Sequence, residues 1–417
     1  MTKTMNKQLG SKKAIVLYLI SALFYFYEFL LQVSPGIMVP DIMHTFSVSA
    51  KQVGYLATWY FAAYALMQLP AGALFDRFGA RILLTVAALM CSIGTFMFAC
   101  THSFAILELS RFVTGIGSAF ALLGTLVIAA TWFPPHRFAL LSGILVTIGM
   151  LGAIFGEKPL ALMLLEFGWH ETLLILAFIG LGLSVVLFVV IRDKTAAIKG
   201  QHQPLVGVGY ILKDKQSWYT AIYGALIYAA TASLGALWGV SFLRVTYGFS
   251  NPQAAGFISM IFVGWALGSP LFGFISDLIR KRKPSLYFSA AISTVLISII
   301  IYWPHLHYFV LASLFVAFGI ASSAFLPSFS IIRELHPAKY SGTALGMMNM
   351  LNNLGGASIP PIIGYLLEMH DKNVVQVLDY TPHDFRVSLI ILPIGLFAAL
   401  LLVPFIRETN CKVRIEK

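Results

Sequence analysis

One carboxylate, Glu28, lies near the middle of an apolar segment that extends from about residue 14 to residue 39. At about 1.5 Å per residue, a helix of this length crosses a bilayer. An acidic side chain at that depth costs about 2.5–3.5 kcal/mol on insertion scales, so it is expected to face a partner or a wet cavity. Glu28 is therefore a candidate for binding a proton or a polar solute. A carboxylic acid that stays protonated, or that a neighbouring helix satisfies, is the simpler alternative.

Helical spacing places Glu28 on one face of this segment together with Ser21, Tyr25, Gln32 and Pro35. Apolar residues cover the remaining faces of the helix. Hydroxyl and amide groups beside a carboxylate suit the binding of a small polar solute. Tyr25 and Gln32 are therefore predicted to contact that solute.

An arginine, Arg111, lies about two turns inside another apolar segment, residues 104–132. Counted along the two helices, Arg111 and Glu28 have similar depths, so their side chains could meet across a cavity. A carboxylate that alternates between an arginine-paired and a desolvated environment can bind and release a proton. The two residues are therefore predicted to form a proton-coupling site. Glu108, one turn before Arg111, competes for the same guanidinium, and the spacing leaves both pairings open.

Other apolar segments carry the aromatic and amide side chains that a polar cavity would need. Asparagine amides in hydrocarbon require partners, so a cluster of three in residues 342–367 is informative. Such a cluster could instead join helices, and aromatic residues in membrane helices more often pack than bind. The predicted solute contacts outside the first segment are Tyr60, Tyr64, Tyr228, Trp238, Asn349, Asn352 and Asn353.

The composition is that of a membrane protein. Of 417 residues, 59% are hydrophobic and 11% are charged, whereas a soluble domain has about 25% charged residues. Six apolar segments precede a polar interval and six follow it, which predicts an all-α polytopic fold of twelve transmembrane helices in two six-helix bundles. The segments are approximately 14–39, 52–74, 82–100, 104–132, 138–163 and 170–191, then 218–246, 253–275, 284–303, 308–332, 342–367 and 385–406.

The distribution of lysine and arginine predicts the orientation of the chain. With both ends inside, the inner segments hold 22 of the 28 basic residues and the outer loops hold only Lys51 and Lys372. No cleavage site follows the basic first residues, so the first helix is expected to be retained. The predicted order is a cytoplasmic tail, a bundle, a cytoplasmic loop, a second bundle and a cytoplasmic tail, at residues 1–13, 14–191, 192–217, 218–406 and 407–417.

The two halves resemble each other in sequence. Residues 72–76 (GALFD) recur as residues 273–277 (GFISD), and residues 21–25 recur as residues 224–228. The nearly constant offset of 201–203 residues predicts parallel repeats about an axis along the membrane normal. At this offset Glu28 aligns with Thr231, so the charge at the centre of the first half has no counterpart in the second.

A tight turn between the second and third apolar segments combines glycine and charge in Gly72, Asp76, Arg77, Gly79 and Arg81. It resembles the loop motif of the major facilitator superfamily, G-x-L-x-D-R-x-G-R-[RK], in which positions 72, 74, 76, 77 and 79 match directly and the basic position is displaced to Arg81. The stretch that begins at Arg111, RFVTGIG, likewise resembles the R-x-x-x-G-x-G motif of that superfamily.

This resemblance implies a transporter with a central cavity and alternating access. It also implies a loop latch, in which Asp76, Arg77 and the equivalent Asp277 help to hold the cytoplasmic ends of the halves together in the outward-open state. A basic turn that only sets the topology is the alternative.

Residues 25–35, YFYEFLLQVSP, also resemble the first helix of a bacterial branch of the superfamily that includes phagosomal amino-acid and nucleoside transporters. The sequence thus predicts secondary active transport of a small polar nutrient, an amino acid or short peptide, across the bacterial inner membrane by proton symport. Organic-anion or sugar-acid uptake, nucleoside uptake, and a transport-dead receptor on the same fold are the alternatives.

No motif in the sequence predicts an enzyme. The chain has no Walker-type phosphate loop, no nucleophile–base arrangement and no His or Cys spacing typical of a metal site. We expect no cofactor beyond the proton gradient, and a monomer whose partners are its solute and the bilayer, not nucleic acid. Glu157 in the fifth segment has no predicted role, and Lys158 is expected to reach the membrane surface.

Overall fold

The computed structural model describes residues 12–134, 137–193, 206–303, 305–337, 340–370 and 376–412 of the chain. Within these residues all regular secondary structure is helical, which confirms the predicted all-α class. Ten of the described stretches are long and apolar enough to cross a membrane. One of them, α4 (Ala50–Cys100), makes two crossings, and α17 (Ser341–His370) adds another. Nine single crossings, the two crossings of α4 and the crossing of α17 together make the twelve predicted transmembrane helices.

The helix α4 contains the turn that the sequence predicts. Its 51 residues would span about 76 Å as a straight helix, more than twice the apolar thickness of a bilayer, which is about 30 Å. The backbone leaves the helical region at Gly79, with φ 76° and ψ 168°, a conformation that glycine adopts without strain. The residues before and after Gly79 therefore form the second and third crossings.

Three of the other crossings in the first half are interrupted near their middle or their end. The first passes through a short 3-10 turn, and the fourth and fifth each divide into two helices. The elements are α2 (Lys12–Val33), η1 (Ser34–Met38), α3 (Val39–Phe46), α4, α5 (Phe104–Ser118), α6 (Ala121–Trp132), α7 (Phe138–Gly156), α8 (Lys158–Phe167) and α9 (Trp169–Val190).

The second half repeats the interruptions of the first and fourth crossings, but its fifth crossing is the continuous helix α17 and its sixth is divided. Its elements are α11 (Lys215–Ser233), η3 (Leu234–Trp238), α12 (Gly239–Tyr247), α13 (Asn251–Leu278), α14 (Lys283–Tyr302), α15 (Tyr308–Ser323), α16 (Pro327–Glu334), α17, η5 (Val377–Asp379), α18 (Pro382–Ser388), α19 (Ile391–Leu402) and η6 (Val403–Phe405). The predicted loop between the halves holds a short helix, α10 (Val206–Lys213). Residues 194–205 of that loop, and residues 1–11 and 413–417 of the predicted tails, lie outside the described residues.

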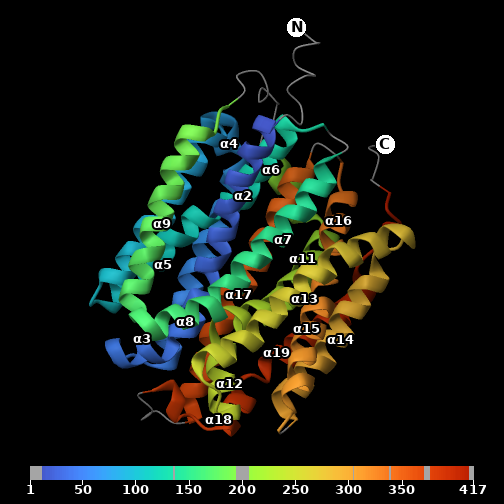
Figure 1. Ribbon diagram of the computed structural model, residues 1–417. Helices are drawn as coiled ribbons and strands as arrows, with labels where there is room; N and C mark the ends of the chain where they lie inside the picture. Colours follow the sequence, from blue (N-terminus) through green and yellow to red (C-terminus); the bar gives the residue numbers. More distant parts are fainter. Residues whose placement is uncertain are drawn as a thin grey trace.

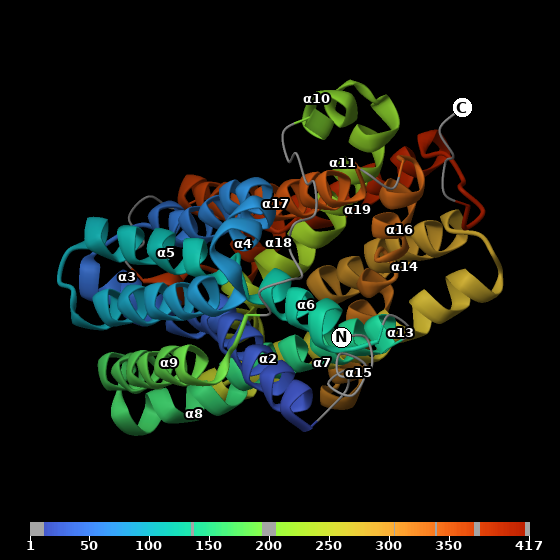
Figure 2. The ribbon, with the colours of Figure 1, turned by 90° about the horizontal axis from the view of Figure 1, so that it is seen from above.

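The two halves lie side by side. In Figures 1 and 2 the helices α5, α8 and α9 are on the left, and α13 to α16 are on the right. Between the halves, α4 packs against α17 and α7 packs against α13. These two helix pairs form the main contact between the halves and flank the space into which α2 and α11 project side chains.

The first helix of each half is interrupted at an equivalent position. The helix α2 gives way to the 3-10 turn η1, and α11 gives way to the π-helical turn η3. The two interruptions meet, because a Cβ at Gly36 would lie only 3.1 Å from the backbone oxygen of Ala236. Irregular backbone at membrane depth is tolerated where protein buries it or where it lines a cavity, and both conditions hold here.

The halves are joined tightly at the end of the molecule that contains α3, at the bottom of Figure 1. Asn251 Nδ2 donates to the carbonyl of Ile37 (2.8 Å), and Ser49 Oγ donates to the Glu368 carboxylate (3.2 Å). Gly54 lies so close to α17 that a Cβ there would come within 2.5 Å of the Pro361 Cα. These contacts close this end of the space between the halves.

Candidate functional site

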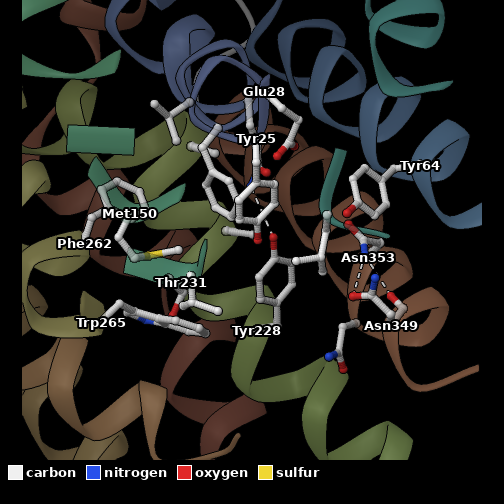
Figure 3. Close-up of a pocket in the computed structure, with 18 of the residues that line it drawn as sticks. Tyr25, Glu28, Tyr64, Met150, Tyr228, Thr231, Phe262, Trp265, Asn349 and Asn353 are labelled. Atoms are coloured by element: carbon white, nitrogen blue, oxygen red, sulfur yellow. Dashed lines mark hydrogen bonds between the residues drawn. The ribbon is translucent and has the colours of Figure 1, made fainter. Parts of the chain in front are cut away.

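A cavity of about 230 Å³ lies between the two halves, and both halves line it. Its walls come from α2, α4, α6 and α7 on one side and from α11, η3, α13, α16 and α17 on the other. Figure 3 shows that polar side chains gather around Tyr64, Asn349 and Asn353, opposite an apolar group around Met150, Phe262 and Trp265. The cavity is therefore two-sided, with one polar and one apolar wall.

The carboxylate of Glu28 borders this cavity from α2 and is fully buried. Its Oε1 accepts a hydrogen bond from the hydroxyl of Tyr60 on α4 (2.6 Å). Its Oε2 has no hydrogen-bond partner among the described residues. Because a buried carboxylate oxygen without a donor is costly, this atom is available to a proton or to a solute in the cavity.

Arg111 on α5 lies behind Tyr60 and is only 4% exposed. Its guanidinium lies 4.4 Å from the centre of the Tyr60 ring and donates to the carbonyls of Leu31 (3.0 Å) and Gln32 (3.4 Å). These carbonyls belong to the last turn of α2, where a cation offsets the helix dipole. Arg111 therefore holds the end of α2 in place.

The two charges of the predicted coupling site are thus connected through an intermediate side chain. Within the described residues, no carboxylate lies within 4.0 Å of the Arg111 guanidinium, so neither Glu28 nor Glu108 forms a direct ion pair with it. Tyr60 instead contacts both, through its ring on one side and its hydroxyl on the other. The sequence predicted Tyr60 as a solute contact, and its place is behind Glu28 rather than in the cavity lining.

Hydrogen bonds along the polar wall join the two halves. Gln32 Nε2 on α2 donates to the hydroxyl of Tyr228 on α11 (3.1 Å). Asn349 Nδ2 on α17 donates to Gln68 Oε1 on α4 (2.8 Å), and Asn353 Nδ2 donates to the Asn349 carbonyl (2.8 Å). The predicted amide cluster therefore both lines the cavity and connects helices, which were the two roles that the sequence left open.

Eight of the predicted solute and proton contacts line the cavity, namely Tyr25, Glu28, Gln32, Tyr64, Tyr228, Asn349, Asn352 and Asn353. Trp238 does not line it. It is fully buried, and its indole Nε1 donates to the Pro360 carbonyl (2.9 Å). Trp238 therefore fastens η3 to α17 within the second half. Glu157 also lies outside the lining, in the break between α7 and α8, and both of its carboxylate oxygens are buried with no hydrogen-bond partner in the described part of the chain.

The apolar wall is the part of the site that the sequence reasoning missed. Its largest members are Phe262, Trp265, Phe325 and Phe329. The internal repeat carried a signal for one of them, because Trp265 stands 201 residues after Tyr64, the same offset that relates the two glycine-rich turns. Transferring each first-half candidate to the second half would have found it.

The predicted gating loop is fastened within its own half. Gly79 packs against Asp193 after α9, and Asp193 Oδ1 accepts from the backbone amides of Ala80 (2.8 Å) and Arg81 (3.2 Å). The Arg81 Nε donates to the carbonyl of Phe188 on α9 (2.8 Å). The loop therefore closes the first bundle on itself in this conformation.

The remaining members of the predicted gating loop have separate surroundings. Gly72 has open space beside its Cα, and Asp76 is half-buried in the same part of α4. Arg77 is exposed and lies over the ring of Phe78. In the second half, Asp277 accepts from Arg282 (2.6 Å), which also pairs with the buried Glu334 (2.8 Å). The ion pair at Asp277 lies within the second half.

Comparison with known proteins identifies relatives of this chain. The family model of the Major Facilitator Superfamily matches residues 17–360 and 241–410. The probable sulfoacetate transporter SauU of Cupriavidus necator is 24% identical over 413 residues, which cover 93% of each chain. The human lysosomal dipeptide transporter MFSD1 is 23% identical over 82% of this chain and 78% of its own. A bacterial homolog of the human lysosomal transporter Spinster, in an inward-facing and unoccupied conformation, has the same fold, with a TM-score of 0.80, 18% identity, and coverage of 95% of this chain and 98% of that one.

Proposed function

The chain belongs to the Major Facilitator Superfamily, and on that premise we propose that it imports a small polar nutrient together with protons. It is a membrane transporter of a small solute rather than an enzyme, as its named relatives are. The preferred solute is an amino acid or short peptide, which the dipeptide transporter among the relatives supports. The name of SauU supports an organic anion as the alternative.

The observation that carries this proposal is the buried carboxylate of Glu28 beside the cavity. One oxygen is held by Tyr60, and the other has no partner within the described residues. When Glu28 is protonated, its free oxygen can donate to a solute in the cavity. A solute that accepts from this buried hydroxyl satisfies it, so the bound solute and the bound proton each make the other's binding more favourable. Proton and solute therefore bind together and cross together, which is symport.

Alternating access follows from the contacts between the halves. In this conformation the halves are tied together at the end that contains α3, through Asn251 and Ser49. Transport requires these contacts to break while the opposite end closes, by rocking of one bundle against the other. We assign the closing contact at that end to the turn that contains Asp76 and Arg77, with Asp277 at the equivalent turn of the second half.

The orientation and the division of the chain are part of the same proposal. We propose that both termini and the loop at 192–217 lie in the cytoplasm of a bacterial cell, with the membrane bundles at 14–191 and 218–406, and the excess of basic residues in these segments supports this orientation. The cavity is shared by the two bundles of one chain, so a monomer has a complete site.

Counterflow in proteoliposomes tests the proposal. Vesicles that hold the purified protein and unlabelled amino acids should accumulate labelled amino acid from outside. An imposed inside-alkaline pH gradient should drive net uptake in the absence of sodium. An inside-negative potential should do the same, because a zwitterion and a proton together carry one positive charge. Binding without counterflow would favour a receptor, and gradient-driven uptake of sugar acids or nucleosides alone would favour the alternative solutes.

A further inference from the structure

We infer that the transported solute has no net negative charge and carries one large apolar side chain, aromatic or branched, which packs against Met150, Phe262 and Trp265. The inference deepens the proposed function and rests on it in one respect, that the central cavity is the transport site. It separates this chain from carriers of sugar acids and sulfonates. Three observations support it: the apolar wall, the charge of the lining and the size of the cavity.

The apolar wall is built to contact a side chain rather than a hydrogen-bonding group. The indole Nε1 of Trp265 donates to Ser322 Oγ (2.8 Å), so the polar atom of this residue is already satisfied. Phe325 lies against the indole, with ring centres 5.5 Å apart, and holds it in place. The ring of Trp265 borders the cavity close to Phe262 and Met150 (Figure 3). Contact with this wall therefore favours the binding of a solute that buries apolar surface against it.

The opposite wall recognises a polar head group through neutral atoms. The hydroxyls of Tyr25, Tyr64 and Tyr228 and the amides of Asn349 and Asn353 border the cavity there. Since the polar and apolar groups are on opposite sides, a solute must itself be two-sided to satisfy both. An α-amino acid with an apolar side chain has this form, whereas a sugar acid is polar along its whole length.

The charge of the lining disfavours anions. Within the part of the chain that the structure describes, no lysine, arginine or histidine lines the cavity, and Glu28 is the only acidic residue that does. Arg111 lies outside the lining, is covered by Tyr60 and donates to the carbonyls of Leu31 and Gln32. A solute with net negative charge would lose its hydration without meeting a positive group, and would face a second negative charge whenever Glu28 is ionised.

The volume limits the solute to one such side chain. A cavity of about 230 Å³ is below the range of about 300–1,000 Å³ that is usual for drug-sized ligands. Among the lining residues, the polar atoms without a hydrogen-bond partner in the described part of the chain are Glu28 Oε2, Thr231 Oγ1 and Asn352 Oδ1, few enough for one small solute. A single amino acid fits this description better than a longer peptide.

Binding to the purified full-length protein tests the inference without requiring transport. Titrations with phenylalanine, leucine, glutamate, galactonate and sulfoacetate are followed by thermal shift and by quenching of tryptophan fluorescence. We expect phenylalanine and leucine to bind at least tenfold more tightly than any of the three acids. Tighter binding of an acid would overturn the inference, and so would a lack of binding by both apolar amino acids.

A variant pair on one helix shows whether the apolar wall is responsible. Trp265→Ala should weaken phenylalanine binding at least tenfold while changing the affinity for alanine less than threefold. Leu267→Ala is the matched control, because Leu267 lies on α13 and is 58% exposed on the outside of the molecule. Trp265→Phe should keep the affinity and lose part of the fluorescence signal. Equal effects of Trp265→Ala and Leu267→Ala on phenylalanine would overturn the inference.

The two proposals can fail separately. If an acid binds most tightly and also undergoes counterflow, the secondary transporter stands and the solute class assigned here is wrong. If phenylalanine or leucine binds with the expected preference but neither shows counterflow, the solute class stands and the transport function is wrong.

Discussion

The two halves of the molecule present equivalent positions with different side chains to one cavity. At the repeat offset, Glu28 of α2 corresponds to Thr231 of α11, and Tyr64 of α4 corresponds to Trp265 of α13. All four residues line the cavity. The first half thus supplies the carboxylate at one of these two positions, and the second supplies the larger aromatic ring at the other. The repeat provides the positions, and the side chain at each position decides what that half can bind.

The two halves can also be compared at the turn that connects the second and third crossings of each half. A carboxylate that follows the last helix of the half accepts hydrogen bonds from the backbone amides of the turn. Asp193 does this for residues 80–81, and Glu408 does it for residues 282–283. An anion at the start of a helix offsets the helix dipole. Each bundle is therefore closed by a carboxylate that follows its last helix.

The two turns differ in how firmly their arginines are held. Arg282 pairs with the buried Glu334 and with Asp277, and Glu334 also accepts from Thr409 of the chain after η6. Its equivalent in the first half, Arg81, donates to a backbone carbonyl and lies over the Phe188 ring. The second turn is therefore the fixed one. The first turn, whose Arg81 makes no ion pair within the described residues, is the better candidate for a contact that forms and breaks during transport.

Replacing the carboxylate that borders the cavity should have the largest effect. Glu28→Gln keeps the shape of the side chain but cannot bind a proton. We expect accumulation driven by a pH gradient to fall to background, while counterflow, which needs no net proton movement, continues. Glu108→Gln is the control, since that carboxylate lies on α5 outside the cavity lining and should leave accumulation unchanged. Normal accumulation by Glu28→Gln would remove the coupling role from this residue.

The turn that contains Arg282 should contribute to the stability of the fold more than to transport. Arg282→Met leaves Glu334 buried without its ion-pair partner, which costs about 3–5 kcal/mol of unfolding free energy. Arg81→Met leaves no buried carboxylate unpaired and should cost less than about 1 kcal/mol. Thermal unfolding of the two purified variants measures the difference. A similar loss in both would show that the two turns are held equally.

The hydroxyl that links the two charges should matter to coupling. Tyr60→Phe removes the donor to Glu28 Oε1, and a buried acceptor without its donor costs about 1–3 kcal/mol. We expect the accumulation ratio at a fixed pH gradient to fall about tenfold. Tyr223→Phe is the control, because its hydroxyl is equally buried in the second half but donates to the Leu286 carbonyl. If both variants lose accumulation equally, Tyr60 has no special role in coupling.

These tests concern contacts that the sequence only partly predicted. The apolar segments, the repeat and the turn at Gly79 could be read from hydrophobicity and glycine, because each has a local physical cause. The polar lining could be predicted because amides and a carboxylate in an apolar segment are costly unless they have polar partners or face a cavity. The apolar wall could not be predicted in this way. Phenylalanine such as Phe262 is equally common where a helix faces lipid, and lipid is as apolar as a protein core, so the residue type does not show which way the side chain faces. The position of Tyr60 between Glu28 and Arg111 depends on how three helices pack, which no single helix encodes.

The first turn is expected to act on the rate of transport. Asp76→Asn should slow turnover by about threefold to tenfold with little change in solute affinity, because it weakens the closing contact proposed for the other conformation and lies outside the cavity lining. That factor corresponds to about 0.7–1.4 kcal/mol in the transition between states. Asp277→Asn, at the equivalent position, should leave turnover less changed, since Asp277 is already paired with Arg282. Initial rates and binding constants for the two variants decide whether the first turn moves and the second stays fixed.

The smallest effect should come from the carboxylate that closes the second bundle, and it should depend on pH. Burial raises the pKa of Glu408, but backbone amides, including those of Arg282 and Lys283, outweigh this and hold the pKa below its usual value. A lowered pKa in the folded state means that the stabilisation is present above the unfolded pKa and is lost as the pH falls through the folded value. Glu408→Gln should therefore lower thermal stability by less than about 1 kcal/mol at pH 7. The difference from the unmodified protein should shrink as the pH falls below about 4.3. Asp193→Asn removes the matching carboxylate from the first bundle, so a much larger loss in one variant than in the other would show that the two closures are not equivalent.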